Sequence, residues 1–328
     1  MGDREWERER YRQKLIGRQK RKPREDRAKP KKQRQKTVIP KKILKGAAAC
    51  LPFLLLAAIA TALLFGGKQK IADGEAHFYF FDVGQADAAV VMTRDSCILI
   101  DAGSNSSAAH LTEKLRAAGV ERIDLAIFSH AHEDHIGGGD SVIDEFEVDR
   151  ILMPQSETYS ATLDRLCSAA ERKGVTIDYT EAVGTLTVGE LTVDILPTLP
   201  NTEDENEASA IIKVRYGNTA AIYTGDAGAE SEQYLLSALG RDALDCDILK
   251  VGHHGSDTSS CSEWIDALSP AFAVISCQRG NEYGHPSYNV LRRLQNVGAT
   301  VCRTDRDGSI LLISDGNEIR PAEAGDNK

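Results

Sequence analysis

The stretch SHAHEDHIGGG, residues 129–139, places three histidines and two acidic residues within six consecutive positions of a chain that has eight histidines in all. It follows the apolar run LAIF, 125–128, which is typical of a buried strand. Imidazoles and carboxylates are common ligands of divalent metal ions, and a strand end is where a rigid scaffold can aim several ligands at one point. A solvated charged loop is the alternative, but so dense a cluster after a buried strand favours a metal site.

The sequence around this stretch follows the same plan twice. The first half has strand-like runs, then a helical pattern at 108–118, then a strand at 123–129; the second half has strands, a helical pattern at 230–239, and a strand that ends in histidines. Asp101 of LIDAG and Asp226 of TGDAG are each followed by histidines at similar intervals, at His130 and His253. We therefore expect an α/β fold in which two β-rich halves, each covered by helices, pack sheet to sheet as an αββα sandwich.

This architecture brings the loops that carry most of the histidines to one edge. The residues predicted as metal ligands are His130, His132, Asp134, His135, Asp226 and His253. His130 and His132 suit one ion, Asp134 and His135 a second, and Asp226 can bridge the two with a shared hydroxide. A core position for His253 and a simple turn for Asp226 are the alternatives. Ligands without thiolate suit Zn²⁺ or Mn²⁺, and the sequence does not choose between these ions.

Other residues are predicted to support this centre. Asp82 and Asp101 are expected to orient ligand histidines, with turn roles as the alternative. Asp134, His254 and His285 are the predicted catalytic residues, although His285 in EYGHPSY also fits a plain loop. Ser256 and Asn206 are the predicted substrate-binding residues, and Ser260 to Glu263 matches a capping box that would begin a helix.

The N-terminal part of the chain differs sharply from the rest. Residues 1–45 hold 19 Lys and Arg against 6 Asp and Glu, whereas the whole chain holds 40 and 49 and has a net charge of −9. This basic segment predicts a disordered tail that binds anionic lipid rather than nucleic acid. The 22 uncharged residues 46–67 are long enough to cross a bilayer as a helix. A cleaved signal peptide is less fitting because the basic head is too long.

The charge asymmetry also predicts an orientation. Basic residues flank the span mainly on its N-terminal side, so the tail is expected in the cytoplasm and the remainder outside the cell membrane. The predicted organisation is a tail at 1–45, a single-pass span at 46–67, a linker at 68–76, a folded domain at 77–314 and a flexible tail at 315–328. Six cysteines in the exported part could pair or remain buried thiols.

Taken in order, the motifs FDVGQADA, LIDAG, SHAHEDHIGG, TGD, KVGHHGS and YGHPS resemble the metallo-β-lactamase superfamily, and specifically the hydrolase domain of ComEC-type competence proteins. The resemblance covers about 77–314. It implies the αββα fold, a di-metal hydrolase site with the six ligands above, and phosphodiester substrates such as incoming DNA. Ala86 replaces a usual glycine, and NEASAIIKV, 206–214, has no histidine where the superfamily often supplies one.

The expected function is therefore a membrane-anchored extracellular di-metal hydrolase, most simply a phosphodiesterase or nuclease. The acidic exported part argues against a processive nuclease, because polyanion binding normally draws on basic surface. Hydrolysis of a cell-wall phosphoester, a nucleotide or a lactone is the alternative enzyme reading. A non-catalytic accessory module of a DNA-uptake or envelope complex is the alternative from another class.

Overall fold

The computed structural model describes residues 71–156, 158–180 and 184–322. The predicted basic tail and membrane span lie outside these residues. Within the described part of the chain, no helix combines the length and the apolar character needed to cross a membrane.

Two β-sheets form the middle of the described structure. The first sheet has the strand order β17 (Ile319–Pro321), β16 (Ile310–Ser314), β1 (Ala76–Phe80), β2 (Ala88–Met92), β3 (Cys97–Ala102), β5 (Leu125–Ile127), β7 (Arg150–Met153), β8 (Thr176–Tyr179). The second sheet has the order β15 (Thr300–Arg303), β14 (Phe272–Ile275), β13 (Ile248–Lys250), β12 (Thr219–Tyr223), β11 (Ile212–Tyr216), β10 (Leu191–Ile195), β9 (Thr185–Val188). A small two-stranded sheet pairs β4 (Arg122–Ile123) with β6 (Glu147–Val148).

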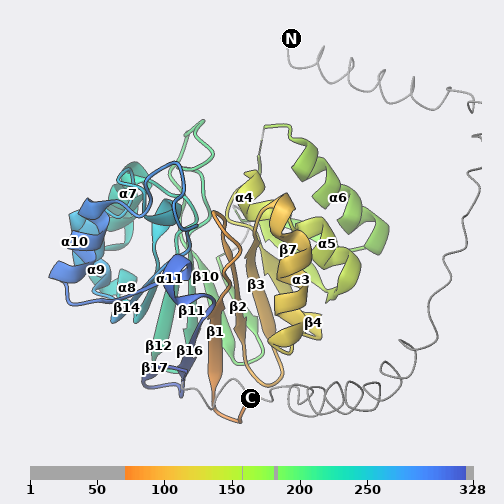
Figure 1. The fold of residues 1–328 in the computed structure, drawn as a ribbon, viewed down its shortest axis with the longest axis horizontal. Helices are drawn as coiled ribbons and strands as arrows, with labels where there is room; N and C mark the ends of the chain where they lie inside the picture. Colours follow the sequence, from red (N-terminus) through yellow and green to blue (C-terminus); the bar gives the residue numbers. More distant parts are fainter. Residues whose placement is uncertain (1–70, 157, 181–183, 323–328) are drawn as a thin grey trace, which may run out of the picture. The chain divides into compact units, whose positions relative to one another are not determined.

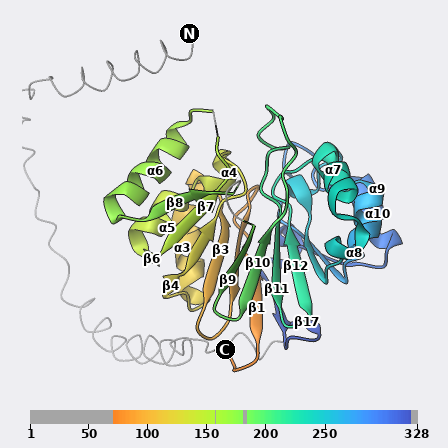
Figure 2. The ribbon, with the colours of Figure 1, turned by 180° about the vertical axis from the view of Figure 1, so that it is seen from behind.

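Helices cover the outer face of each sheet, as Figures 1 and 2 show from opposite sides. The first half contributes η1 (Asn105–Ser107), α3 (Ala108–Ala117), α4 (Glu133–Ile136), α5 (Gly139–Glu145) and α6 (Ala161–Lys173). The second half contributes α7 (Ala229–Leu239), α8 (Arg241–Leu244), η3 (Gly252–Gly255), α9 (Ser262–Leu268), α10 (Tyr288–Asn296) and α11 (Thr304–Asp307). The predicted αββα sandwich is therefore confirmed for the described residues.

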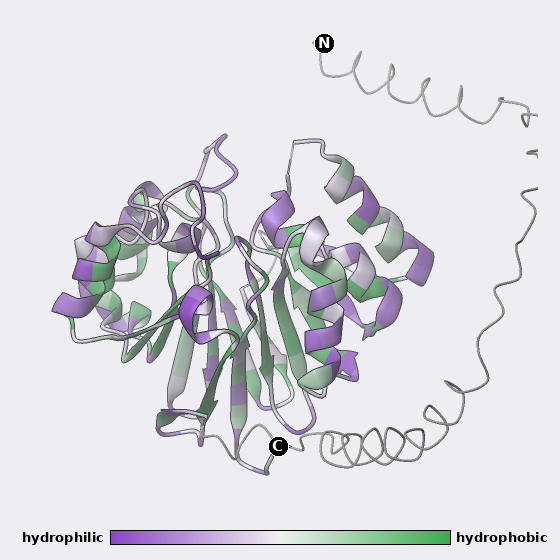
Figure 3. Cartoon of the chain, in the orientation of Figure 1, coloured by the Kyte–Doolittle hydropathy of each residue, from purple (hydrophilic) through white to green (hydrophobic). Residues whose placement is uncertain are grey.

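The alternation of side chains along the strands explains the layers. In β1, Phe78 and Phe80 are fully buried between the two sheets, whereas Tyr79 and the next residue after the strand, Phe81, pack under the helices of the first half. The ring of Phe80 stacks on Tyr223 of β12 with centroids 5.7 Å apart. Figure 3 shows the same division, with hydrophobic colour on the strands and hydrophilic colour on the outward sides of the helices.

Both sheets change from antiparallel to parallel pairing at an equivalent place. The strands β1, β2 and β3 pair antiparallel, and β3, β5, β7 and β8 continue in parallel. In the second sheet, β9 to β12 pair antiparallel and β12 to β15 continue in parallel. This confirms the internal similarity predicted from the sequence, and it places the ends of β3, β5, β12 and β13 at corresponding edges.

The sheet extends beyond the predicted end of the folded domain. β17 pairs with β16 in an antiparallel register, with Leu312 opposite Pro321. Residues 319–321 of the predicted tail therefore add a strand to the first sheet, and residues 323–328 lie outside the described part. All six cysteines of this part are free thiols.

Candidate metal centre

The first half supplies four of the predicted ligands from one continuous segment, residues 130–135. His130 and His132 follow β5, and Asp134 and His135 lie in the short helix α4, whose N-cap is His132. A side chain at Gly137 would collide with the backbone of Ser104 and Asn105, because a Cβ there would lie 2.2 Å from Asn105 N. The glycine therefore lets the histidine stretch lie directly on the end of β3.

The second half supplies its residues from the ends of β12 and β13. Asp226 follows β12, and His253 and His254 lie in η3 after β13 with φ values of 49° and 52°. Gly225, with φ 52°, brings this half against the first, since a Cβ there would lie 2.6 Å from Ser129 Cβ. The backbone of Ala210 also donates a hydrogen bond to Ser129 O at 2.8 Å.

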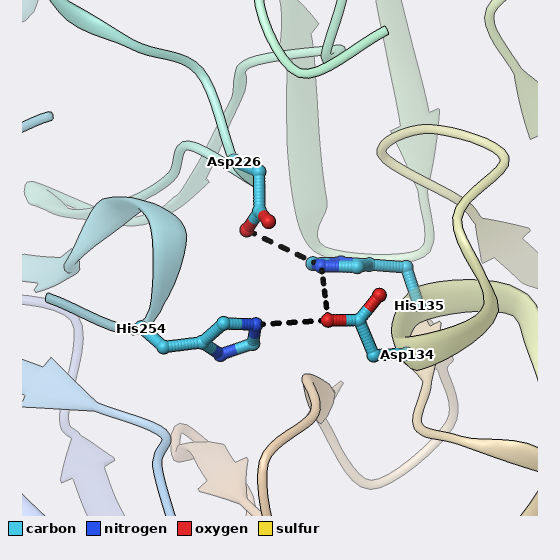
Figure 4. A group of neighbouring side chains, drawn as sticks. All are labelled: Asp134, His135, Asp226 and His254. Carbon is cyan, nitrogen blue, oxygen red and sulfur yellow. Dashed lines mark hydrogen bonds and ion pairs between the residues drawn. The ribbon is translucent and has the colours of Figure 1, made fainter. Parts of the chain in front are cut away.

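These loops place carboxylates and imidazoles around one space, as Figure 4 shows. Ligand atoms of Asp134, His135, Asp226 and His254 all lie within 4.8 Å of one another. Asp134 Oδ2 is 3.2 Å from His254 Nε2, and Asp226 Oδ1 is 3.2 Å from His135 Nε2. His254 was predicted as a catalytic residue rather than a ligand, so its place within this group is a residue role that the sequence missed.

The remaining predicted ligands surround this group. The ring of His130 lies 4.2 Å from that of His135 and 4.6 Å from that of His132, centroid to centroid. His253 Nε2 lies 3.6 Å from Asp226 Oδ2. His132 is the most exposed of the set, and its Nε2 lies 3.4 Å from Glu205 Oε2.

The donor atoms fit divalent ions. Three ligand atoms of this cluster are buried without a donor–acceptor hydrogen bond to the rest of the protein: His130 Nε2, His135 Nε2 and Asp226 Oδ1, of which the last two face each other as an ion pair at 3.2 Å. Buried polar atoms are nearly always satisfied in folded proteins, and leaving them so costs free energy. Imidazole nitrogens and carboxylate oxygens that converge in a buried cluster are the chemistry of a metal site, and these residues could hold one or two ions.

A buried carboxylate orients one histidine. Asp101 Oδ2 lies 2.8 Å from His135 Nδ1, and Asp101 also accepts hydrogen bonds from Ser129 N at 2.7 Å and Ser129 Oγ at 2.8 Å. This contact fixes the ring so that Nε2 faces the cluster, which is how carboxylates orient metal-binding histidines. The geometry agrees with the orienting role predicted for Asp101.

The second carboxylate beside a histidine of the cluster is Asp87 rather than Asp82. Asp82 lies in the turn after β1, where its Oδ1 accepts a hydrogen bond from Gly84 N at 3.4 Å. Asp87 Oδ1, by contrast, lies 3.3 Å from His254 Nδ1, which also lies 3.1 Å from the carbonyl oxygen of Ser276, and Asp87 Oδ2 lies 2.6 Å from Lys250 Nζ. The prediction for Asp82 is therefore corrected: both carboxylates occur in the same motif, but only the fold shows which of them turns inward.

Charge and burial perturb the histidines in opposite directions. Burial lowers the pKa of His130 well below its usual value, and the neighbouring His135 adds to this. Burial would also lower the pKa of His135, but the charges of Asp226 and Asp101 outweigh it and hold that pKa well above the usual value. Burial opposes a charged His254 as well, yet Asp87 and Asp226 raise its pKa to about 10. The carboxylates thus stabilise positive charge within the cluster.

A cavity of about 700 Å³ opens onto the cluster. Besides five residues of the cluster, two further predicted residues line it: Asn206, whose Oδ1 has no hydrogen-bond partner, and His285, whose Nδ1 has none. Burial, with the charges of His254 and His253, lowers the pKa of His285. Asn206 and His285 are thus placed where a substrate would lie.

Ser256 does not line this cavity. It is buried, and its hydroxyl lies 2.9 Å from Thr258 Oγ1, which in turn lies 3.3 Å from His253 Nδ1. The predicted role of Ser256 in substrate binding is therefore corrected. Its hydroxyl instead contacts Thr258, which supports the ring of His253 on the side away from Nε2. The predicted capping box is also wrong, because Ser260 N and Cys261 N donate to the buried carboxylate of Glu232 instead.

The residues that sequence reasoning missed are Asp87, Lys250 and Glu205. Lys250 and Asp87 are 4% and 5% exposed at their side chains, and Lys250 comes from β13 while Asp87 lies just before β2. A lysine inside an apolar run, as in ILKVG, is the signal that could have pointed to a buried partner. Glu205 gave no such signal, because it lies in a run of acidic residues.

Comparison with known proteins agrees with this fold. A model of the metallo-beta-lactamase superfamily matches residues 81–279, which is more than half of the chain, and the chain therefore belongs to this superfamily. It is similar to ComE operon protein 3 of Bacillus subtilis (strain 168), with 31% identity over 76% of this chain and 34% of that protein. Competence protein ComA of Neisseria gonorrhoeae is 29% identical over 80% of this chain and 39% of that protein.

These relatives confirm the resemblance to ComEC-type competence proteins that the motifs indicated. The chain spans roughly a third of their length. Among solved structures, the metallo-beta-lactamase fold protein YhfI from Bacillus subtilis aligns with a TM-score of 0.46 and 13% identity, over 75% of this chain and 99% of that one. By its family match and its curated relatives, the chain is a member of this superfamily that is related to competence proteins.

Proposed function

We propose that this protein is a metal-dependent phosphodiesterase acting outside the cell on nucleic acid or a related phosphodiester, with two Zn²⁺ or Mn²⁺ ions held by the clustered histidines and carboxylates. The observation that carries the proposal is the convergence of buried imidazole and carboxylate atoms of His130, His135 and Asp226, which come from both halves and lie beside one cavity. Similarity to competence proteins supports a nucleic-acid substrate.

The metal-binding part of the proposal assigns residues as the sequence did, with one addition. The residues that would hold the ions are His130, His132, Asp134, His135, Asp226 and His253, together with His254. When bound, such ions lower the pKa of a coordinated water toward neutrality and neutralise phosphate charge. Asp101 and Asp87 keep the rings of His135 and His254 turned toward the cluster.

The cavity residues would then position the substrate. His285 has a lowered pKa and is mainly neutral near pH 7, so one ring nitrogen can donate a hydrogen bond to a phosphate or leaving-group oxygen. The amide of Asn206 lines the same cavity and lacks a partner for its Oδ1. These side chains bind and orient the phosphodiester, which contributes to rate by positioning.

The location belongs to the proposal as well. The uncharged segment 46–67 is proposed as a single-pass anchor with the basic tail in the cytoplasm, in contact with anionic lipid. The hydrolase domain would then meet its substrate outside the cell. Loss of membrane association on deletion of 1–67, measured by fractionation, is the expected result, and unchanged membrane association would contradict the anchor.

The function is tested by hydrolysis. The full-length chain, loaded separately with Mn²⁺ and Zn²⁺, is assayed on single-stranded DNA, double-stranded DNA and bis-p-nitrophenyl phosphate. Asp134→Ala is expected to reduce the rate by at least about 100-fold, because it removes a proposed ligand without removing core volume. Asp82→Asn is the matched control, since that carboxylate contacts only the turn at Gly84.

Each outcome has a distinct meaning. DNA cleavage that is lost in Asp134→Ala supports the nuclease. Cleavage of the small diester alone favours the second candidate, a hydrolase of a small exported phosphoester, which the acidic composition outside residues 1–45 also favours. Wild-type rates in folded Asp134→Ala protein would contradict the metal-dependent mechanism.

A further inference from the structure

An exposed aromatic side chain stands at the rim of the cavity. Tyr283 is 66% exposed and lines the cavity together with Asp134, Asp226 and His254. Its ring stacks on His285, with centroids 5.7 Å apart and an angle of 28° between the ring planes. Tyr283 is therefore an exposed aromatic side chain that both lines the candidate site and stacks on a second ring of it.

The rings continue from the rim to the metal cluster. The ring of His285 lies 5.9 Å from that of His253, which in turn lies beside Asp226. Tyr283, His285 and His253 therefore form a row that leads from solvent to the proposed ligands. A planar group stacked on Tyr283 would be held beside the place where a phosphodiester is proposed to react.

The loop that carries Tyr283 is held by hydrogen bonds. Asn281 Oδ1 accepts from His285 N at 3.0 Å, and Asn281 Nδ2 donates to Gln278 O at 2.9 Å and to His285 O at 2.6 Å. Gln278 N donates to Gln85 Oε1 at 3.0 Å, which ties the loop to the first half. Such bracing limits the entropy that would be lost when a ligand stacks on the loop.

Two polar atoms of residues that line the same cavity also lack hydrogen-bond partners. Gln85 Nε2 and Asn206 Oδ1 are buried without hydrogen bonds, and both residues line the cavity. One is a donor and the other an acceptor, which is the combination that the polar edge of a heterocyclic base requires. The aromatic face and the amides together suit a ligand that is planar and polar at its edge.

From these contacts we infer that Tyr283 and His285 form a stacking platform for a nucleobase next to the reacting phosphodiester. Stacking on aromatic side chains is the main sequence-tolerant means of binding single-stranded nucleic acid. The inference rests on the proposed function and sharpens it, because cell-wall phosphoesters and lactones lack a base to stack. Such a platform would let an acidic protein bind a nucleotide, since stacking does not depend on a basic surface.

The test distinguishes the contribution of the nucleobases from that of the sugar-phosphate backbone. The full-length chain with Mn²⁺ is assayed on a single-stranded oligothymidylate and on the same backbone with abasic sites throughout. Tyr283→Ala is expected to lower kcat/KM on the base-containing strand by about 5- to 150-fold, the usual range for loss of one stacked base, and to leave the abasic strand unchanged. Tyr283→Phe keeps the ring and is expected to retain activity.

The matched control is Tyr288→Ala. Tyr288 is 75% exposed and close in sequence, but it lies on α10 and does not line the cavity. Tyr288→Ala is expected to leave kcat/KM unchanged on both the base-containing and the abasic strand. An equal loss of activity on both strands in Tyr283→Ala, or no loss on either, would overturn the stacking platform.

A binding measurement keeps this test separate from that of the proposed function. The fluorescence anisotropy of the two labelled oligonucleotides is measured without added metal. Weaker binding of Tyr283→Ala to the base-containing strand alone supports the platform even if the wild-type chain cleaves neither strand, which would refute the phosphodiesterase. Identical binding of wild type and Tyr283→Ala to the base-containing strand would refute the platform even if cleavage is observed.

Discussion

At the residue scale, the centre depends on carboxylates that hold histidines in place. Asp101 has a φ of 56° and contacts both His135 and the Ser129 backbone. Asn tolerates this left-handed conformation and keeps an acceptor oxygen, but it removes the negative charge. We expect Asp101→Asn to weaken Mn²⁺ or Zn²⁺ binding by about 10- to 100-fold, measured by calorimetric titration of the full-length chain.

The control for this variant is Asp82→Asn, which changes a carboxylate in the same half outside the cluster. It is expected to bind the metal as the wild type does. Unchanged affinity in Asp101→Asn would show that the contact with His135 does not orient a ligand.

The buried ion pair of Lys250 and Asp87 leads to a second prediction at the residue scale, which concerns the free energy of unfolding. Burial opposes ionisation of Asp87, but Lys250 and His254 hold its pKa below the usual value. Removing one partner of a buried pair leaves an uncompensated charge, so Lys250→Met should lower the free energy of unfolding by about 3 to 5 kcal/mol in urea denaturation. The double variant Lys250→Met with Asp87→Asn should recover part of this loss, and a loss below about 1 kcal/mol in the single variant would contradict the account.

Sequence alone predicted most residues of the centre because its pattern is local. The stretch 129–135 carries three histidines and Asp134 within one turn, and the chain's own repeat indicated Asp226 and His253. The pairing of Asp87 with Lys250 was missed because the two residues are far apart in sequence and meet only through packing. His254 joined the cluster because the left-handed backbone at both histidines turns two adjacent side chains toward neighbouring carboxylates.

At the scale of elements, α7 and α9 are joined by one buried carboxylate. Glu232 of α7 is fully buried and accepts hydrogen bonds from Ser260 N at 2.5 Å and Cys261 N at 2.8 Å, directly before α9. Burial outweighs these hydrogen bonds and raises the pKa of Glu232 to about 7. The carboxylate therefore replaces the local capping box that the sequence suggested.

This raised pKa has a consequence for stability. The folded protein binds the proton of Glu232 more tightly than the unfolded chain does, so the contribution is fully present below pH about 4.5 and is lost as pH rises through about 7. Glu232→Gln cannot ionise and should flatten the fall in unfolding free energy over this window, measured by denaturation at several pH values. An identical pH profile in both proteins would contradict the assignment.

The sequence predicted the positions of the strands more accurately than the residues at which helices begin. The alternating and apolar runs of β1, β2, β3 and β5 are visible in the sequence because burial on both faces demands them. The start of α9 could not be read locally, since its cap comes from another helix. The addition of β16 and β17 to the first sheet also depends on long-range pairing with β1.

At the scale of the whole described structure, the centre joins the two halves of the sandwich. His130 and His135 come from the first half, and Asp226 and His254 come from the second. Ions bound between them would stabilise the folded state, by about 4 kcal/mol when free metal is 1,000-fold above Kd. Chelation should then lower Tm by roughly 8 to 16 °C for a chain of this size, measured by calorimetry.

The variant Asp226→Asn provides the comparison for chelation. Because it weakens a proposed ligand that faces both halves, its Tm should respond much less to the chelator than that of the wild type. A wild-type Tm that does not change on chelation would contradict metal binding between the halves.

The most direct measurement is the metal content of the purified full-length chain. After exchange into buffer with Mn²⁺ or Zn²⁺ and removal of free ions, elemental mass spectrometry should find two ions per wild-type chain and fewer in Asp226→Asn. A folded wild-type chain that retains no divalent ion, or an Asp226→Asn chain that retains the same two, would contradict the centre proposed for this protein.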